Sequence, residues 1–174
     1  ANHPTLIDVV VLIGLMEQAN CVVKQALWSN PFTKGPVQSA GYILNAGSEQ
    51  FIQDCVHKLQ QDHAASLLIF PEGTRTAKGE QLNDFQRGAA NIALRAGVPI
   101  RPVLISCTPS TLTKNEKWYH IPEQPFHIHV KVLDAIRVED VLDDVTVNPK
   151  NVRQLNQQLQ WFFNQELSVN EQSC

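Results

Sequence analysis

Apolar residues along this chain follow two spacings that alternate from one end to the other. In some segments they recur at the period of one helix face, and in others they form short runs or alternate with polar residues, as in strands. The helical spacing predicts helices over 5–18, 48–61, 85–96 and 152–167. The short runs predict strands over 20–23, 41–44, 66–70, 100–107 and 126–136. Strands that alternate with helices favour an α/β fold, with a mixed, mainly parallel central sheet flanked by helices.

Local signals refine individual segments. Ser48 is a suitable N-cap for the second helix, and Gly97 is a suitable C-cap for the third. The run SLLIF at 66–70 is apolar without a break, which suits a strand covered on both faces. The segment 126–136 alternates instead and follows a long loop, so we expect it near an edge of the sheet. Apolar residues surround most of the first helix, which predicts that this helix is buried.

Length and charge narrow the class of protein. With 174 residues, of which 43% are hydrophobic, the chain is long enough for one core and short for two, so we expect a single domain over 1–174. A net charge of −3 gives no basic surplus for binding nucleic acid. The apolar run from Val9 to Met16 is far shorter than the ~20 residues of a membrane span. The most suggestive motif begins directly after Ala1, and we therefore expect a further segment upstream of it.

The cysteines and histidines of the later chain form no recognisable metal motif. No short spacing joins the four cysteines, which are Cys21, Cys55, Cys107 and Cys174. We therefore expect no redox pair and no disulfide framework, and we expect the first three to be small buried hydrophobes in a reducing compartment. His127 and His129 alternate on one predicted strand and share a face, but no third ligand follows at a matching spacing. We expect no metal site.

The first eight residues, ANHPTLID, place two titratable side chains around the start of the first helix. Pro4 disfavours the α region for His3 and suits the first helical turn itself, so His3 lies just before the helix and Asp8 one turn into it. The Asp8 carboxylate can then reach the imidazole, fix its tautomer and leave the other ring nitrogen as a general base. The alternative is an aspartate that only charges the first turn, beside an incidental histidine. Because no GxSxG sequence or recognisable nucleophilic cysteine is present, a basic pair would activate a substrate hydroxyl directly.

A second candidate is FPEGTR at 70–75, which follows the apolar strand. In α/β folds, the turn at a strand end is a common place for a ligand site. Gly73 would let the backbone approach a ligand closely, and Arg75 offers a planar fork suited to phosphate or carboxylate. The alternative is a charged turn in which Glu72 and Arg75 are solvated or paired with each other.

Two weaker candidates lie on either side of this turn. Lys24 follows a predicted strand directly and could contact phosphate, although a solvated lysine explains it equally well. In AGVPIRPVLI at 96–105, Gly97 and Pro99 shape a turn from helix to strand, which is an architectural role. Pro102 is tolerated there mainly at a strand start or an edge.

Several of these segments together resemble the glycerol-phosphate and lysophospholipid acyltransferase family. NHPTLID resembles the NHx4D motif of the family, FPEGTR its third block and VPIRPV its fourth, while KQALWSNPF and FQRGAANIALRAG resemble intervening segments. The resemblance covers about residues 2–105 and leaves the C-terminal third aside. It implies the family's α/β fold and the transfer of a fatty acyl group from a CoA or carrier-protein thioester to a hydroxyl acceptor, with no cofactor.

The resemblance also implies roles for individual residues. His3 would be the general base and Asp8 the group that orients and stabilises it. The third block would bind the acceptor and its phosphate, and the fourth would bind the acyl donor or shape the site. With Lys24 as a candidate phosphate contact, the substrate-binding residues are then Lys24, Glu72, Gly73, Thr74, Arg75, Val98, Pro99 and Pro102.

The second block of the family leaves the acceptor open. It normally carries an arginine that contacts the acceptor phosphate, whereas the equivalent GYILNAG has Gly41 and no arginine after it. The acceptor could be a lysophospholipid, a glycolipid or another hydroxylated lipid. We expect work at the cytoplasmic face of the inner membrane, reached through an upstream segment, and carrier protein as a partner if it supplies the donor. A thioesterase-like hydrolase with the same pair, and a non-catalytic lipid-binding protein, are the rival functions.

Overall fold

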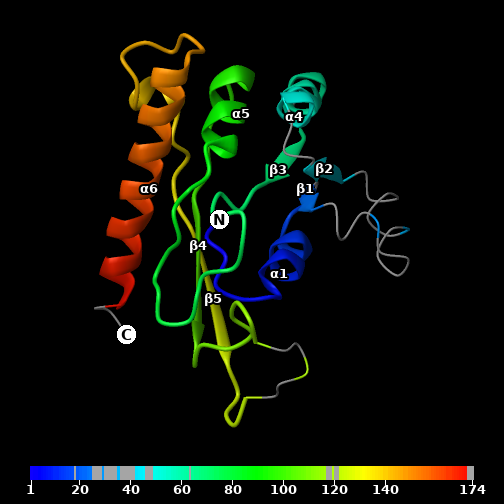
Figure 1. The fold of residues 1–174 in the computed structure, drawn as a ribbon, viewed down its shortest axis with the longest axis vertical. Helices are drawn as coiled ribbons and strands as arrows, with labels where there is room; N and C mark the ends of the chain where they lie inside the picture. Colours follow the sequence, from blue (N-terminus) through cyan, green and yellow to red (C-terminus); the bar gives the residue numbers. More distant parts are fainter. Residues whose placement is uncertain are drawn as a thin grey trace.

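A computed structural model describes residues 1–17, 19–24, 29, 35, 42–45, 49–62, 64–116, 119 and 122–171 (Figure 1). At 19, 23, 24, 45, 170 and 171 it describes the main chain alone. The described elements, in chain order, are α1 (Asp8–Leu15), β1 (Ala19–Lys24), β2 (Ile43–Asn45), α4 (Glu49–Gln61), β3 (Ser66–Leu68), α5 (Gly88–Ala96), β4 (Val103–Thr108), β5 (His127–Val132), the 3-10 helix η1 (Val138–Asp140) and α6 (Pro149–Glu171). Helices thus alternate with strands through the first two thirds, as predicted, and no described helix is both long and apolar enough to span a bilayer.

The described strands form a mixed set of pairings, as predicted, divided between two small sheets. Strand β1 lies between β2 and β3 and is parallel to both, with Val22 opposite Ile43 and Ala19 opposite Ser66. Strand β4 pairs with β5 in antiparallel fashion, with Ile105 opposite Val130. Among the described strands β5 has no second neighbour, which agrees with the expected edge position.

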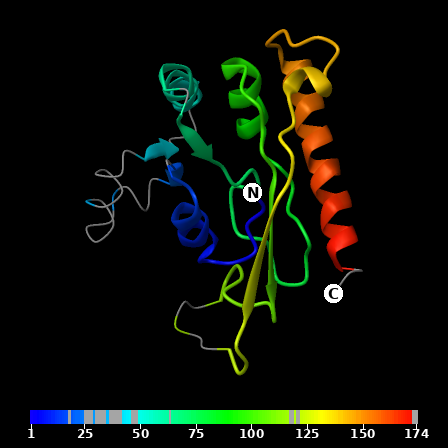
Figure 2. The same ribbon diagram turned by 180° about the vertical axis from the view of Figure 1, so that it is seen from behind.

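Helices pack on the two sheets and leave three hydrophobic clusters between the layers. Helix α6 runs beside α5 and the β4–β5 pair, and both views show it along one side of the molecule (Figures 1 and 2). Its buried residues, among them Leu155 and Phe163, form the largest cluster with α5 and β4. Helix α4 packs on α5, β2 and β3 through Phe51 and Ile52. A third cluster joins Leu12 of α1 to the two sheets.

Most predicted helices and strands are present, but several begin or end at other residues than predicted. The strand expected at 66–70 ends at Leu68, and the one expected at 100–107 begins at Val103. Pro102 comes directly before β4, the strand start at which proline is tolerated. Helix α5 closes on Gly97 in the left-handed conformation (φ 65°), as its sequence predicts. The expected N-cap Ser48 lies outside the described residues.

The first helix departs most from its prediction. It begins at Asp8 and ends at Leu15, instead of spanning 5–18, and residues 5–7 form a turn. The expectation that this helix is buried is wrong, because Val10 is 72% exposed and Leu15 is 69% exposed. Only Asp8 and Leu12 are buried, on the side that faces the sheets. An apolar circumference predicts burial, but it carries no information on how much of the surface the rest of the fold covers.

Candidate active site

The segment before α1 lies between the two sheets and is bound to both. Asn2 Nδ2 donates to the Ile105 carbonyl oxygen (2.9 Å), and Asn2 Oδ1 accepts the Ile105 N–H (2.7 Å). The amide side chain therefore takes the place that a neighbouring strand would take on this edge of β4. On the other side, the Ala1 nitrogen donates to the carbonyl oxygen of Ile69, just beyond β3 (3.1 Å). These contacts fix the position of the residue that follows them, His3.

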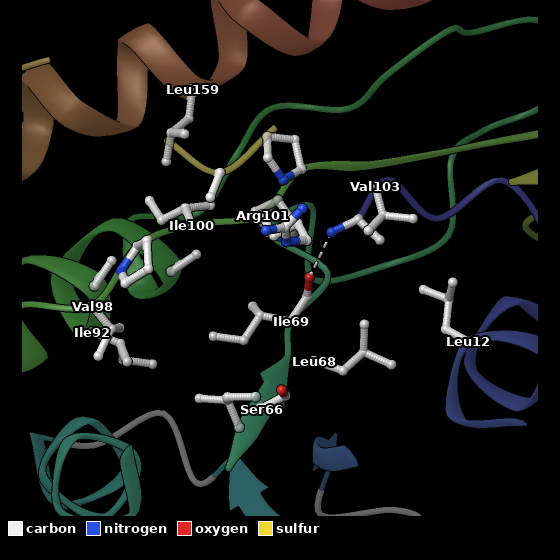
Figure 3. A pocket seen from close by; sticks show the side chains of 18 of the residues that line it. Leu12, Ser66, Leu68, Ile69, Ile92, Val98, Ile100, Arg101, Val103 and Leu159 are labelled. Carbon is white, nitrogen blue, oxygen red and sulfur yellow. Dashed lines mark hydrogen bonds between the residues drawn. The ribbon is translucent and has the colours of Figure 1, made fainter. Parts of the chain in front are cut away.

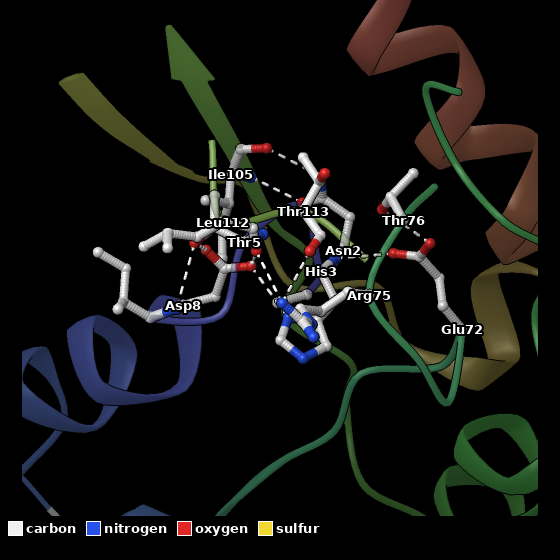
Figure 4. A network of polar contacts seen from close by, with 12 residues as sticks. Asn2, His3, Thr5, Asp8, Glu72, Arg75, Thr76, Ile105, Leu112 and Thr113 are labelled. Atoms are coloured by element: carbon white, nitrogen blue, oxygen red, sulfur yellow. Dashed lines mark hydrogen bonds and ion pairs between the residues drawn. The ribbon is translucent and has the colours of Figure 1, made fainter. Parts of the chain in front are cut away.

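The contact predicted between His3 and Asp8 is present. His3 Nδ1 lies 3.0 Å from Asp8 Oδ2, and the Asp8 side chain is fully buried. The same carboxylate accepts the Thr5 N–H (2.7 Å) and the Thr5 hydroxyl, so both of its oxygens are occupied (Figure 4). An ionised carboxylate only accepts hydrogen bonds, so this contact favours the tautomer of the neutral ring in which Nδ1 carries the proton and Nε2 has the lone pair. These contacts at Asp8 are also why residues 5–7 turn and do not extend the helix.

The His3 ring is held on one face and retains some exposure. Its ring stacks on Phe70, with centroids 4.3 Å apart and planes at 30°. The His3 side chain is 16% exposed, whereas the Asp8 side chain is inaccessible. One ring nitrogen is thus bound to a buried acid while the ring still reaches the surface. That is the arrangement required of a base that must meet a substrate from outside.

The main chain of His3 is bound by the segment FPEGTR and the residue after it. The His3 N–H donates to Glu72 Oε1 (2.7 Å), and the His3 carbonyl accepts the Thr76 N–H (2.8 Å). Glu72 is only 3% exposed, and its other oxygen accepts the Thr76 hydroxyl (2.9 Å) and the Asn83 N–H (2.9 Å). The alternative of a solvated Glu72, or one paired with Arg75, is therefore wrong. Its carboxylate is instead bound inside the fold.

Arg75 holds a loop that follows β4. Arg75 Nη1 donates to the carbonyl oxygens of Leu112 (2.9 Å) and Thr113 (2.8 Å). The Leu112 carbonyl also accepts the Leu6 N–H (3.0 Å). Arg75 and the turn between His3 and Asp8 therefore bond to the same carbonyl oxygen. Leu112 has a positive φ of 54°, an uncommon conformation for a branched residue. Arg75 thus stabilises this loop beside the pair.

The remaining residues of the third block form the turn itself. Gly73 has a φ of 68°, and its N–H closes the turn on the Phe70 carbonyl (3.0 Å). A side chain at this position would be strained by the backbone angle, whatever space surrounds it. Thr74 is half-buried between Gly73 and Arg75. The predicted phosphate contact at Lys24 lies outside the described side chains, since only its main chain, at the end of β1, is described.

An apolar cavity of about 700 Å³ lies beside this polar cluster, between β3 and the segment that leads into β4 (Figure 3). The three predicted donor-side residues Val98, Pro99 and Pro102 all line it. Leu12 of α1 lies toward one end of the cavity in Figure 3, and Leu159 of α6 lies toward the other. Ala1, Ile69 and Pro71 also line it, so the cavity reaches both sequence neighbours of Phe70 and the residue two positions before His3.

Among the described residues, the thiols and the histidines other than His3 add neither a reactive nucleophile nor a cluster of metal ligands. Burial raises the pKa of Cys21 to about 11 and that of Cys55 to about 12. Cys107 is half-buried, so the expectation of full burial is wrong for it, and burial raises its pKa above the ordinary value. A raised pKa lowers the thiolate fraction and hence the reactivity. His127 and His129 are exposed on β5, and the described residues include no cluster of metal-ligating side chains.

Sequence reasoning missed several residues that build this site. Asn2, Thr5, Phe70 and Thr76 all contact His3, Asp8 or Glu72, or hold the segment that carries them. Thr5 had a local signal, because a threonine three residues before an aspartate can bond to its carboxylate within one turn. Asn2 had none, since its partner Ile105 lies 103 residues away.

The fold is a mixed α/β fold in which the partly exposed His3 contacts the buried Asp8 at the start of the first helix. Residues 1–106 match the family described as Acyltransferase, and the chain belongs to that family. Over its whole length the fold resembles the 1-acyl-sn-glycerophosphate (LPA) acyltransferase of Thermotoga maritima, with a TM-score of 0.75 and 19% identity, covering 98% of this chain and 64% of that one. The predicted fold class is thereby confirmed.

Curated relatives carry a consistent name. The 1-acyl-sn-glycerol-3-phosphate acyltransferase alpha of Mus musculus is 36% identical over 88% of this chain and 54% of its own. The 1-acyl-sn-glycerol-3-phosphate acyltransferase of Helicobacter pylori is 32% identical over 60% of this chain and 46% of its own. The chain thus spans about half the length of these relatives.

Proposed function

We propose that this chain transfers a fatty acyl group from a CoA or carrier-protein thioester to a hydroxyl of a lysophospholipid of the 1-acylglycerol-3-phosphate class or a related lipid. The observation that carries the proposal is the 3.0 Å contact between His3 Nδ1 and the buried Asp8 carboxylate, with the ring still partly exposed. The names of the relatives support the acceptor class. The apolar cavity beside the pair supports a donor or acceptor that carries a hydrocarbon chain.

The reaction needs one base and no covalent enzyme intermediate. Nε2 of His3 takes the proton of the acceptor hydroxyl while the hydroxyl oxygen bonds to the thioester carbonyl carbon. The C–S bond then breaks, and the departing thiolate takes the proton back from the imidazolium to leave as a thiol. Asp8 holds the tautomer and stabilises the imidazolium throughout. Positioned proton transfer of this kind contributes about 10²–10⁴-fold, and alignment of thioester and hydroxyl adds to it.

The acceptor side is proposed for the surface near Arg75, and the donor chain for the cavity. The guanidinium lies next to the loop that follows β4 and shares an acceptor with the turn after His3, so a phosphate bound there would lie near the base. The exposed Gly73 and the half-buried Thr74 lie in the same turn, and Lys24 is a further candidate. Because both substrates are lipids or lipid-linked, we propose action at the cytoplasmic face of a cell membrane, with a carrier protein as partner where it supplies the donor.

The test measures thiol release from acyl-CoA and acyl-carrier protein in the presence and absence of lysophosphatidate. We expect release to require the acceptor and the acylated lipid to accumulate in equal amount. His3→Ala should lower turnover by about 10²–10⁴-fold or more while circular dichroism and the thermal midpoint stay as in the parent protein. Release that is independent of the acceptor would instead favour hydrolysis by the same pair. Lipid binding without release would favour a non-catalytic protein.

A further inference from the structure

We infer that Glu72 is a positioning residue for His3 and does not contact the acceptor. The inference rests on the proposed function and assigns a different role to one residue of the same site. The carboxylate of Glu72 bonds to the main chain of His3, 69 positions away, and sets where the base stands. The resemblance to the family had placed Glu72 among the acceptor-binding residues, so the two roles predict different kinetics.

Burial, the existing hydrogen bonds and the negative charge argue against acceptor contact by Glu72. The residue is 3% exposed, and both carboxylate oxygens already accept hydrogen bonds, Oε1 from His3 and Oε2 from Thr76 and Asn83. To meet a substrate hydroxyl, the carboxylate would have to turn out of this buried position and give up hydrogen bonds to His3, Thr76 or Asn83, or the substrate would have to enter the interior of the turn. A phosphate would in addition be repelled by the negative charge. The neighbouring Gly73 is exposed, so the acceptor can reach this turn without reaching the carboxylate.

Geometry argues for a positioning role. Glu72 accepts the N–H of His3 at 2.7 Å and Thr76 donates to its carbonyl at 2.8 Å, so both peptide planes that flank the His3 Cα are held by one short segment. Phe70, from the same segment, lies against the ring, and Asp8 holds Nδ1. The residues around this turn therefore fix His3 at its backbone, its ring face and one ring nitrogen. A displacement of about 1 Å in such a group can cost about 10²-fold in rate.

Glu72→Gln separates the two roles. Glutamine keeps the size and one acceptor, but its amide nitrogen must face a main-chain N–H of either His3 or Asn83, so one of these bonds is lost. We expect turnover at saturating donor and acceptor to fall about 10- to 100-fold, with the acceptor KM unchanged within about twofold. Glu166→Gln is the matched control: it neutralises a carboxylate on α6 that pairs with Lys131 of β5, and it should leave both values unchanged. An acceptor KM raised more than about tenfold, with turnover preserved, would overturn the inference.

Two further measurements keep the result interpretable. If Glu72→Gln does not fold, Thr76→Val removes only one donor from the carboxylate, and we expect a smaller fall in turnover, about 3- to 10-fold, that Thr76→Ser restores. The imidazole ¹H–¹⁵N resonances of His3, identified by their absence in His3→Ala, should shift or broaden in Glu72→Gln and stay in place in Glu166→Gln. This spectrum tests positioning even if the protein transfers no acyl group. Unchanged His3 resonances in Glu72→Gln would refute the inference independently of the proposed function.

Discussion

The two ends of the site are built by different physical means. Around His3, directional contacts dominate: the buried carboxylates of Asp8 and Glu72 each accept three hydrogen bonds. The neighbouring cavity of about 700 Å³ is lined mostly by apolar side chains. Directional bonds fix atoms to within fractions of an ångström, whereas apolar walls exclude water and set only a volume.

This difference indicates which end of the site should set the turnover rate and which should set the preference among acyl donors. A base that must meet a hydroxyl and a thioester carbonyl needs a fixed position, and the polar end supplies it. A hydrocarbon chain needs only space and desolvation, which the cavity supplies. Substitutions at the polar end should therefore change turnover for every donor alike, and substitutions in the cavity should change the preference among donors.

The largest loss of turnover is expected for Asp8→Asn, at the polar end of the site. The amide nitrogen would face the donors on Thr5 or the Nδ1–H of His3, and the negative charge that supports the imidazolium would be lost. We expect turnover to fall about 10²–10⁴-fold with every acyl donor, measured by thiol release. Asp54→Asn, at an exposed aspartate paired with Gln50 on α4, is the matched control and should retain full turnover. Turnover of Asp8→Asn within about threefold of the parent would contradict the assigned role.

A substitution in the cavity should change selectivity and spare the chemistry. Ala89 lines the cavity from α5, and Ala89→Leu adds three carbons to that wall. We expect kcat/KM for long-chain donors to fall about 10-fold relative to short-chain donors, because excluding about one methylene is worth 1–3 kcal/mol. Competition between donors of two chain lengths measures this ratio directly. Ala96→Leu, on the same helix and outside the cavity lining, should leave the ratio unchanged; an equal loss for all donors with Ala89→Leu would show that the cavity does not hold the chain.

The smallest expected effect lies on the exposed side of α1, and Leu12 on the covered side provides the contrast. Val10 is 72% exposed on this helix, so Val10→Gln should change the free energy of unfolding by less than about 0.5 kcal/mol. Leu12 is 4% exposed and packs against the sheets, so Leu12→Ala should cost about 2–5 kcal/mol. Urea unfolding of both variants measures the contrast. A loss of more than about 1 kcal/mol for Val10→Gln would mean that its side of the helix is covered in the folded protein.

Local sequence patterns predicted the helices and strands well where the structure of a segment depends mainly on its own residues. The helical spacing over 48–61 and 85–96 corresponds to α4 and α5. Gly97 ends α5 because glycine readily adopts the left-handed conformation that stops a helix. The spacing between His3 and Asp8 placed their side chains in reach of each other, since five residues around a turn leave few alternatives. The start of α1 could not be predicted in this way, because the side chain of Asp8 competes with the helix for the main chain of Thr5.

By itself, then, the sequence determined the order of helices and strands, the His3–Asp8 pair and the family resemblance of its blocks. Only the tertiary structure decided that Asn2 binds the edge of β4, that Glu72 holds the main chain of His3 and that Arg75 ties the loop at Leu112. It also decided which side of α1 is covered. The physical reason is distance along the chain: hydrogen bonds between residues 37 to 103 positions apart depend on how separate elements pack, and periodicity within one element carries no record of its neighbours.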